Sequence, residues 1–138
     1  MPRAAGMDEP VMSKLSKKSL DGNVETLLLA TLAEQPSYGY QIVADLNQTA
    51  PDLLRMGEGT VYPVLHRLEE RGLITATWRT GRTGRPRKYY KLTPRGRRAL
   101  EENRQQWHGL ARVMQSVLGP NTSQADHIPN QALEGGTT

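Results

Sequence analysis

The sequence holds 138 residues with a formal net charge of +4, 36% hydrophobic residues and no cysteine. This length fits one domain with tails, and the lack of cysteine excludes disulfides, thiol nucleophiles and thiolate zinc sites. The longest apolar run, Leu27–Ala30, is four residues long, far below the roughly 20 residues of a transmembrane helix. The first twelve residues lack the apolar core of a signal peptide, so we expect a cytoplasmic protein with no membrane partner.

The basic residues concentrate in one segment of the chain. Residues 79–98 carry nine Lys or Arg and no Asp or Glu, whereas the remaining residues carry nine basic and fourteen acidic side chains. Charge that serves only solubility is spread over a surface, so this segment indicates a polyanionic partner. A solvated basic loop is the alternative interpretation.

Both ends of the chain lack the apolar periodicity of a folded segment. Residues 1–13 are mostly small, charged or proline-rich, and residues 119–138 contain few apolar side chains, so we expect both to be disordered. The middle of the chain divides into a compact domain over 14–93 and one long helix over 94–118.

Three helices are predicted in the first half of the compact domain. Apolar residues at helical spacing predict the first over Asn23–Glu34. Ser37 is expected to cap the second, which runs to about Gln48. The third spans about Gly59–Arg71, with Gly59 or Thr60 as its cap and Gly72 as its left-handed stop.

The pattern then changes from helical to strand-like. Residues 73–79 and 87–92 are rich in β-branched and aromatic side chains, and the turn residues of 80–86 lie between them, so we expect a β-hairpin with a cationic tip. Alternation along the second strand puts Tyr89 and Tyr90 on opposite faces, and only one of them packs inward. Thr93-Pro94 is a typical start for the last helix.

This order of elements predicts an α+β, mainly α fold: a winged helix-turn-helix followed by a long C-terminal dimerisation helix. The third helix is short enough to enter the major groove of DNA, about 12 Å wide. The hairpin can track phosphates or insert an arginine into a minor groove. Double-stranded DNA is therefore the predicted partner, and a winged helix that binds only another protein is the alternative. The deep, narrow major groove of A-form RNA disfavours RNA.

Three linked motifs resemble the PadR family of bacterial transcriptional regulators. They are Tyr38–Ile42, Gly57–Ile74 and Gly84–Gly96, and with their flanks they cover about residues 20–118. The single terminal helix is similar to that of the short PadR subfamily, which dimerises through it. The resemblance implies a homodimeric repressor on a pseudo-palindromic operator. In some relatives, phenolic acids or hydrophobic drugs release the DNA.

The candidate DNA-binding residues come from the second and third helices and the hairpin. Thr60 and Tyr62 can donate to phosphates or base edges, and Arg67 can reach phosphate or guanine. For Tyr62, core packing is the alternative. The full predicted set is Tyr38, Tyr40, Gly59, Thr60, Tyr62, Pro63, His66, Arg67, Arg82, Arg85, Arg87 and Lys88.

An apolar stripe on the last helix predicts a second copy of the chain as partner. Its members are Leu100, Trp107, Leu110, Met114 and Val117. Left unpaired, the stripe would expose a larger apolar patch than monomers usually carry. Two copies of Trp107 across a two-fold axis can stack, or can line a slot for a small planar aromatic or hydrophobic effector. The alternative is that Trp107 only fills the dimer core.

Catalysis has little support in the sequence. The three histidines at 66, 108 and 127 are far apart along the chain, and no phosphate-loop, HExxH or GxSxG pattern occurs. We therefore predict no enzyme, no cofactor and no metal site.

Overall fold

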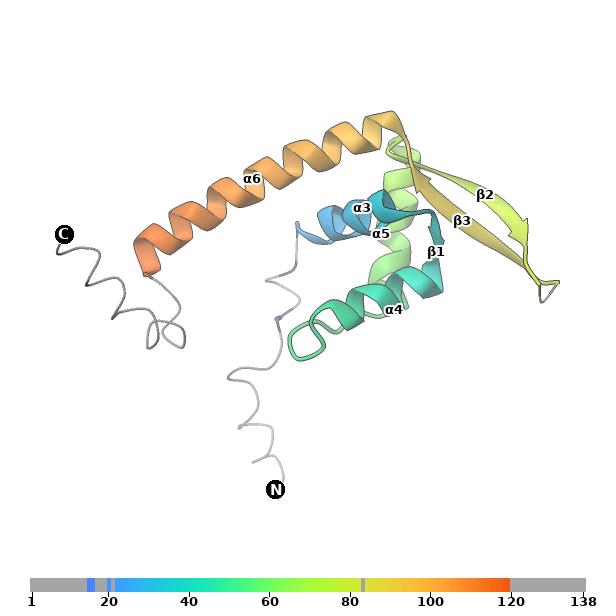
Figure 1. Cartoon of the computed structure of the whole chain (residues 1–138), viewed down its shortest axis with the longest axis horizontal. Coiled ribbons are helices and arrows are strands. Elements are labelled where there is room, and N and C mark those ends of the chain that lie inside the picture. Colours follow the sequence, from blue (N-terminus) through green and yellow to red (C-terminus); the bar gives the residue numbers. More distant parts are fainter. Residues whose placement is uncertain (1–14, 17–19, 21, 83, 120–138) are drawn as a thin grey trace, which may run out of the picture. The chain divides into compact units, whose positions relative to one another are not determined.

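The computed structural model describes residues 15–16, 20, 22–82 and 84–119. In chain order the elements are α3 (Val24–Glu34), β1 (Ser37–Tyr38), α4 (Gly39–Thr49), α5 (Glu58–Glu70), β2 (Ile74–Thr80), β3 (Pro86–Leu92) and α6 (Pro94–Leu118) (Figure 1). The predicted mainly α winged helix-turn-helix is confirmed, with helix and strand limits within a residue or two of those expected. The segments 1–13 and 119–138, for which we predict disorder, lie outside the described residues except for Gly119, whose amide donates to the Gln115 carbonyl at the end of α6.

The sheet has three antiparallel strands in the order β1-β3-β2. The strand β1 was not expected, and it corrects the predicted role of Ser37. This residue lies opposite Tyr90 in the sheet and is only 5% exposed. It does not cap α4, which begins at Gly39 after an extended Tyr38 without a side-chain cap.

The predicted cap of α5 is also wrong. Gly57 is the N-cap residue, with no side-chain hydrogen bond, and Gly59 and Thr60 lie inside the first turn. Glu58 supplies a negative charge in that turn, where the helix dipole favours one. The helix ends as predicted, because Gly72 takes a left-handed φ of +76° and the Leu73 amide donates back to the Leu68 carbonyl.

The core lies between the three helices and the inner face of the sheet. Leu28, Ile42 and Leu65 are fully buried, one from each helix, and Tyr90 joins them from β3. Tyr89, on the other face of the strand, stays half-buried, so the predicted split between these neighbours is confirmed. The helix stripes and the strand alternation therefore converge on one apolar core.

The start of α6 belongs to this compact unit. The Gly96 amide donates to the Thr93 hydroxyl oxygen at 3.0 Å, as expected of an N-cap. Leu100 is buried in the core at 5% exposure, so the structure removes it from the predicted dimer stripe. The first compact unit runs through Glu102 and a second unit starts at Asn103.

Within the described residues, none of the helices combines the length and apolar character needed to span a membrane.

Candidate nucleic-acid interface

One side of α5 is buried and the other is exposed. Val61, Leu65 and Leu68 point into the core. The exposed or half-buried residues on the other side include all six predicted for this helix: Gly59, Thr60, Tyr62, Pro63, His66 and Arg67. The amphipathic period of α5 thus leaves a polar helix face open to a partner.

Tyr62 occupies the place where α5 meets α4. A Cβ atom at Gly39 would collide with the Tyr62 ring, so only glycine allows the first turn of α4 this close to the ring. The side chain is still 40% exposed. Burial, followed by the nearby Glu58 and Tyr90, raises the pKa of Tyr62, so its hydroxyl keeps its proton to a higher pH than that of a free tyrosine.

A cleft of about 410 Å³ lies between the hairpin of β2 and β3, which we call the wing, and the starts of α4 and α5. Six of the predicted DNA-binding residues line it: Tyr38, Tyr40, Tyr62, Arg85, Arg87 and Lys88. The other lining residues are Gly39, Trp78, Pro86 and Tyr90. Among the described residues, those that line this cleft include no carboxylate. Its walls therefore combine aromatic rings and positive charge, the two features that bind phosphates and stack on sugars and bases.

The outer face of the sheet carries an arrangement that we call the arginine–tyrosine cluster: Arg79, Tyr89, Tyr38 and Arg87. The Arg79 guanidinium lies 4.3 Å from the Tyr89 ring centroid, and the Arg87 guanidinium lies 4.4 Å from that of Tyr38. The two tyrosine rings meet edge to face at 5.2 Å. Each ring covers one face of a guanidinium and leaves its N–H edge available for an anion.

The register of the sheet brings this cluster together. Arg79 lies directly opposite Arg87, and Tyr38 lies directly opposite Tyr89. Like charges opposite each other are unfavourable in a sheet. The stacking on tyrosine offsets part of that cost, and a bound anion would remove more of it.

Lys88 lies on the inner side of the wing and is already engaged. Its Nζ atom is 3.2 Å from Glu69 Oε1 and 5.3 Å from the Tyr90 ring centroid. Burial alone would lower the pKa of Lys88, but the hydrogen bond to Glu69 and the charges of Tyr90 and Glu69 raise it overall. Its charge is therefore shared with α5.

The remaining predicted residues lie apart from the cleft. Thr60, Pro63 and Arg67 line a separate groove of about 430 Å³ beside the start of α3. Arg82 is exposed near the wing tip, where the Gly84 amide donates to the Gly81 carbonyl at 2.9 Å. The interface thus has two parts, one on each side of the exposed face of α5.

Sequence reasoning missed three side chains of the wing: Trp78, Arg79 and Tyr89. Trp78 is 67% exposed and lies opposite Lys88, at the cleft. Once the hairpin register is known, strand alternation places Arg79 beside Tyr89 and Arg87. No sequence pattern predicted β1, so the position of Tyr38 in the cluster could not be predicted from the sequence.

The described part of the second unit is the remainder of α6, which carries exposed apolar side chains. Trp107 is 51% exposed, and Leu110, Met114 and Val117 are exposed as well. Val113 and Leu118 extend this apolar set beyond the predicted stripe. Within the described residues, no group of three His, Cys, Asp or Glu side chains is placed to hold a metal ion.

Known proteins match this sequence and fold. The Transcriptional regulator PadR-like family matches residues 28–102. Transcriptional regulator Rv3488 of Mycobacterium tuberculosis is 48% identical over 65 residues, which are 47% of this chain and 57% of that protein. An uncharacterised protein of Lysinibacillus sphaericus is 30% identical over 93 residues, covering 67% of this chain and 85% of that protein.

Solved structures agree with these sequence matches. A PadR-like transcriptional regulator from Bacillus cereus superposes with a TM-score of 0.68 at 30% identity, covering 76% of this chain and 100% of that one. A transcriptional regulator from Clostridium thermocellum gives a TM-score of 0.67 at 29% identity, covering 74% and 96%. The chain belongs to the PadR-like family of transcriptional regulators.

Proposed function

We propose that this chain is a homodimeric repressor that binds a pseudo-palindromic, double-stranded DNA operator. One observation carries the proposal: the carboxylate-free cleft of aromatic and basic side chains beside the exposed face of α5, as the described residues form it. Such a surface suits a polyanion with stacked, planar components. The regulator would act in the cytoplasm, where bacterial chromosomal DNA lies.

The two parts of the interface divide the work of binding. Thr60 and Arg67 lie on the exposed face of α5 and can reach base edges in a major groove. Arg82, Arg85 and Arg87 belong to the wing, which extends away from the helices (Figure 1) and can follow phosphates or enter a minor groove. In this scheme α5 selects the sequence and the wing supplies affinity.

Dimerisation supplies the symmetry of the operator. The exposed apolar side chains of α6, among them Leu110 and Val117, would be covered by the same helix of a second copy. A two-fold dimer presents two copies of α5 and two wings, which matches two inverted half-sites on DNA.

A gel-shift series tests the DNA-binding proposal. The full chain is titrated with B-form genomic fragments, duplex RNA and single strands, and bound fragments are selected and sequenced. We expect an enriched inverted-repeat motif in duplex DNA and weaker binding of the other two. The alternative, a winged helix that binds only protein, predicts no selection of any sequence. This alternative does not explain why the wing carries no acidic residue, because a protein partner does not require that.

We further propose that Trp107 lines a slot for a planar aromatic effector in the dimer. Its indole is half exposed, and the His108 ring meets it edge to face at 5.5 Å. In the Trp78→Phe variant, Trp107 is the only indole, so a planar guest should quench or shift its emission and weaken DNA binding. If a varied panel of aromatic compounds changes neither the emission nor the DNA affinity, Trp107 only fills the dimer core.

A further inference from the structure

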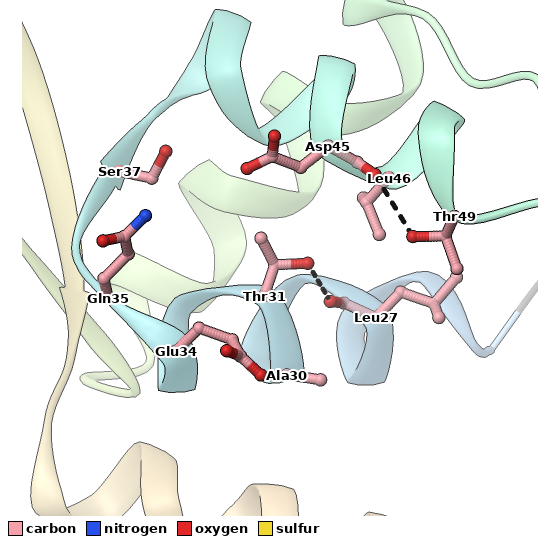
Figure 2. A pocket seen from close by; sticks show the side chains of 9 residues that line it. All are labelled: Leu27, Ala30, Thr31, Glu34, Gln35, Ser37, Asp45, Leu46 and Thr49. Atoms are coloured by element: carbon pink, nitrogen blue, oxygen red, sulfur yellow. Dashed lines mark hydrogen bonds between the residues drawn. The ribbon is translucent and has the colours of Figure 1, made fainter.

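A second groove, of about 440 Å³, lies between α3 and α4 and has no role in the interface described above. Figure 2 shows its lining side chains, which come from α3, the connection into β1, the first residue of β1 and the last half of α4. Leu27, Ala30 and Leu46 make up its apolar part. This volume lies within the range of small-molecule sites, about 300–1,000 Å³.

The polar part of the groove is acidic. Glu34 and Asp45 line it, and none of the described residues around it is Lys, Arg or His. Within the described part of the chain neither carboxylate has an ion-pair partner, and Asp45 Oδ1 accepts only the amide of Gln41, at 2.8 Å. The two carboxylates therefore leave an uncompensated negative charge beside an apolar surface.

The ends of both helices add to this negative potential. Glu34 is the last residue of α3 and Thr49 is the last residue of α4, and both line the groove. Neither helix has a basic residue in its last turn to neutralise the negative end of its dipole. A cation is favoured there for the same reason that Lys or Arg is favoured at helix C-termini.

One buried hydroxyl also faces this space without a partner. Ser37 is 5% exposed, and its hydroxyl makes no hydrogen bond to any described residue. In Figure 2 its oxygen points toward the carboxylate of Asp45. Thr31 and Thr49 differ, since their hydroxyls donate to the carbonyls of Leu27 and Asp45. A buried polar group without a partner is costly, so Ser37 marks a place where a ligand group is accepted.

We propose that this groove binds a monovalent organic cation: a protonated amine with an apolar or aromatic body. The ammonium donates to Asp45, Glu34 or the Ser37 hydroxyl oxygen, and the body covers Leu27 and Leu46. The uncompensated carboxylates exclude an organic anion.

The groove also gives such a ligand a route to DNA binding, a consequence that rests on the proposed function. The helix α4 ends at the groove and begins at Gly39, which packs against the Tyr62 ring of α5. We infer that an occupant in contact with both α3 and α4 favours a different spacing of the two helices, which would shift Tyr40 and Tyr62 in the cleft. We therefore expect occupancy to weaken operator binding.

Calorimetric titration of the full chain with three matched probes tests the site. The probes are 4-phenylbutylammonium, 4-phenylbutanol and 4-phenylbutyrate, which share one body and differ in charge. We expect one ammonium per chain, with the alcohol roughly tenfold to a hundredfold weaker, as loss of a charge-assisted hydrogen bond implies, and no binding of the anion. Equal binding of the three probes would overturn the proposal without any variant.

Substitutions then locate the site. The double variant Glu34→Gln/Asp45→Asn should lose the preference for 4-phenylbutylammonium over 4-phenylbutanol. Ala30→Leu should weaken the binding of both probes, because the larger side chain fills the groove. The control Glu102→Gln removes an exposed carboxylate of α6 and should change neither. Unchanged ammonium affinity in the double variant, or its loss in Trp107→Ala instead, would refute the groove as the site.

DNA binding is measured separately, with and without a saturating concentration of 4-phenylbutylammonium. Equal operator affinity in both conditions would overturn the coupling between groove and cleft. Failure of the chain to bind any DNA would overturn the proposed function, while the calorimetric result would still decide whether the groove binds cations.

Discussion

At the residue scale, the proposed function gives the side chains on α5 and those on the wing different roles in DNA binding. Arg67 stands on an exposed helix face suited to base edges, whereas Arg82 stands on a hairpin suited to phosphates. A base contact depends on sequence, and a phosphate contact does not. The two kinds of residue should therefore separate in a selection experiment.

The first residue-scale prediction concerns sequence readout. Arg67→Ala and Thr60→Ala should each alter the preference for particular base pairs by roughly 1–3 kcal/mol, the value of one good base contact. Arg82→Ala should weaken all sequences alike. Selection from a randomised site measures both effects. The same motif for wild type and both helix variants would show that specificity comes from elsewhere.

The second residue-scale prediction concerns the arginine–tyrosine cluster. Arg79→Ala should flatten the slope of log affinity against log salt by about 0.9 for each phosphate that the protein no longer neutralises. Tyr89→Leu keeps every charge but removes the ring under Arg79, so affinity should fall with a smaller change in slope. Tyr89→Phe keeps the ring and should resemble wild type.

A matched control exists for this charge change. Arg112→Ala removes an exposed arginine of α6 that lines neither the cleft nor the groove of the interface. Its salt slope should remain that of wild type. If Arg79→Ala and Arg112→Ala have the same slope, the cluster is not part of the DNA interface.

At the scale of elements, local signals predicted the three helices, the hairpin and the cap at Thr93: apolar spacing, turn residues and capping residues. The prediction failed where an element depends on a distant partner. A two-residue strand such as β1 has no period of its own, and it exists because Ser37 pairs with Tyr90. The prediction that Leu100 belongs to the dimer stripe was wrong for a related reason. One apolar stripe of α6 runs from the buried core onto an exposed surface, and residue spacing does not distinguish the buried part from the exposed part.

The same limit applied to the interface. The exposed residues of α5 followed from its amphipathic pattern, so the α5 candidates proved accessible. The arginine–tyrosine cluster needs the register of three strands, and the pairing of Lys88 with Glu69 needs the packing of the wing against α5. Neither is encoded in local spacing.

The element-scale prediction concerns the junction of α4 and α5. Gly39→Ala should destabilise the fold by about 1–3 kcal/mol, because the new methyl group collides with the Tyr62 ring. The penalty should shrink in a Tyr62→Ala background, where the ring is absent. Urea unfolding of the four variants of this cycle measures the coupling.

Gly59→Ala provides the control for that experiment. This glycine is also helical, but a Cβ there meets nothing within 4 Å. Alanine should therefore stabilise the fold, by roughly 0.5–1 kcal/mol from helix propensity. Equal destabilisation at both positions would contradict the steric role of Tyr62.

At the scale of the whole molecule, the apolar side chains of α6 are the largest feature that a lone chain leaves unexplained. Trp107, Leu110, Met114 and Val117 fall on one helical face, and all are exposed. Covering such a face with a second copy buries it and also creates the two-fold symmetry that an inverted-repeat operator requires. Assembly and DNA recognition are then linked.

The last prediction tests that link. Leu110→Glu places a charge in the proposed dimer interface, and burying an unpaired charge is costly. Light scattering should give twice the 15.4 kDa of one chain for wild type and a shift toward the monomer for the variant. Because a monomer engages one half-site at a time, the variant should also lose affinity for the full operator far more than for an isolated half-site.

Gln105→Glu adds the same charge on the opposite face of α6 and should leave both mass and affinity unchanged. A wild-type chain that scatters as a monomer at micromolar concentration would refute the dimer, and operator binding would then need an explanation within one chain.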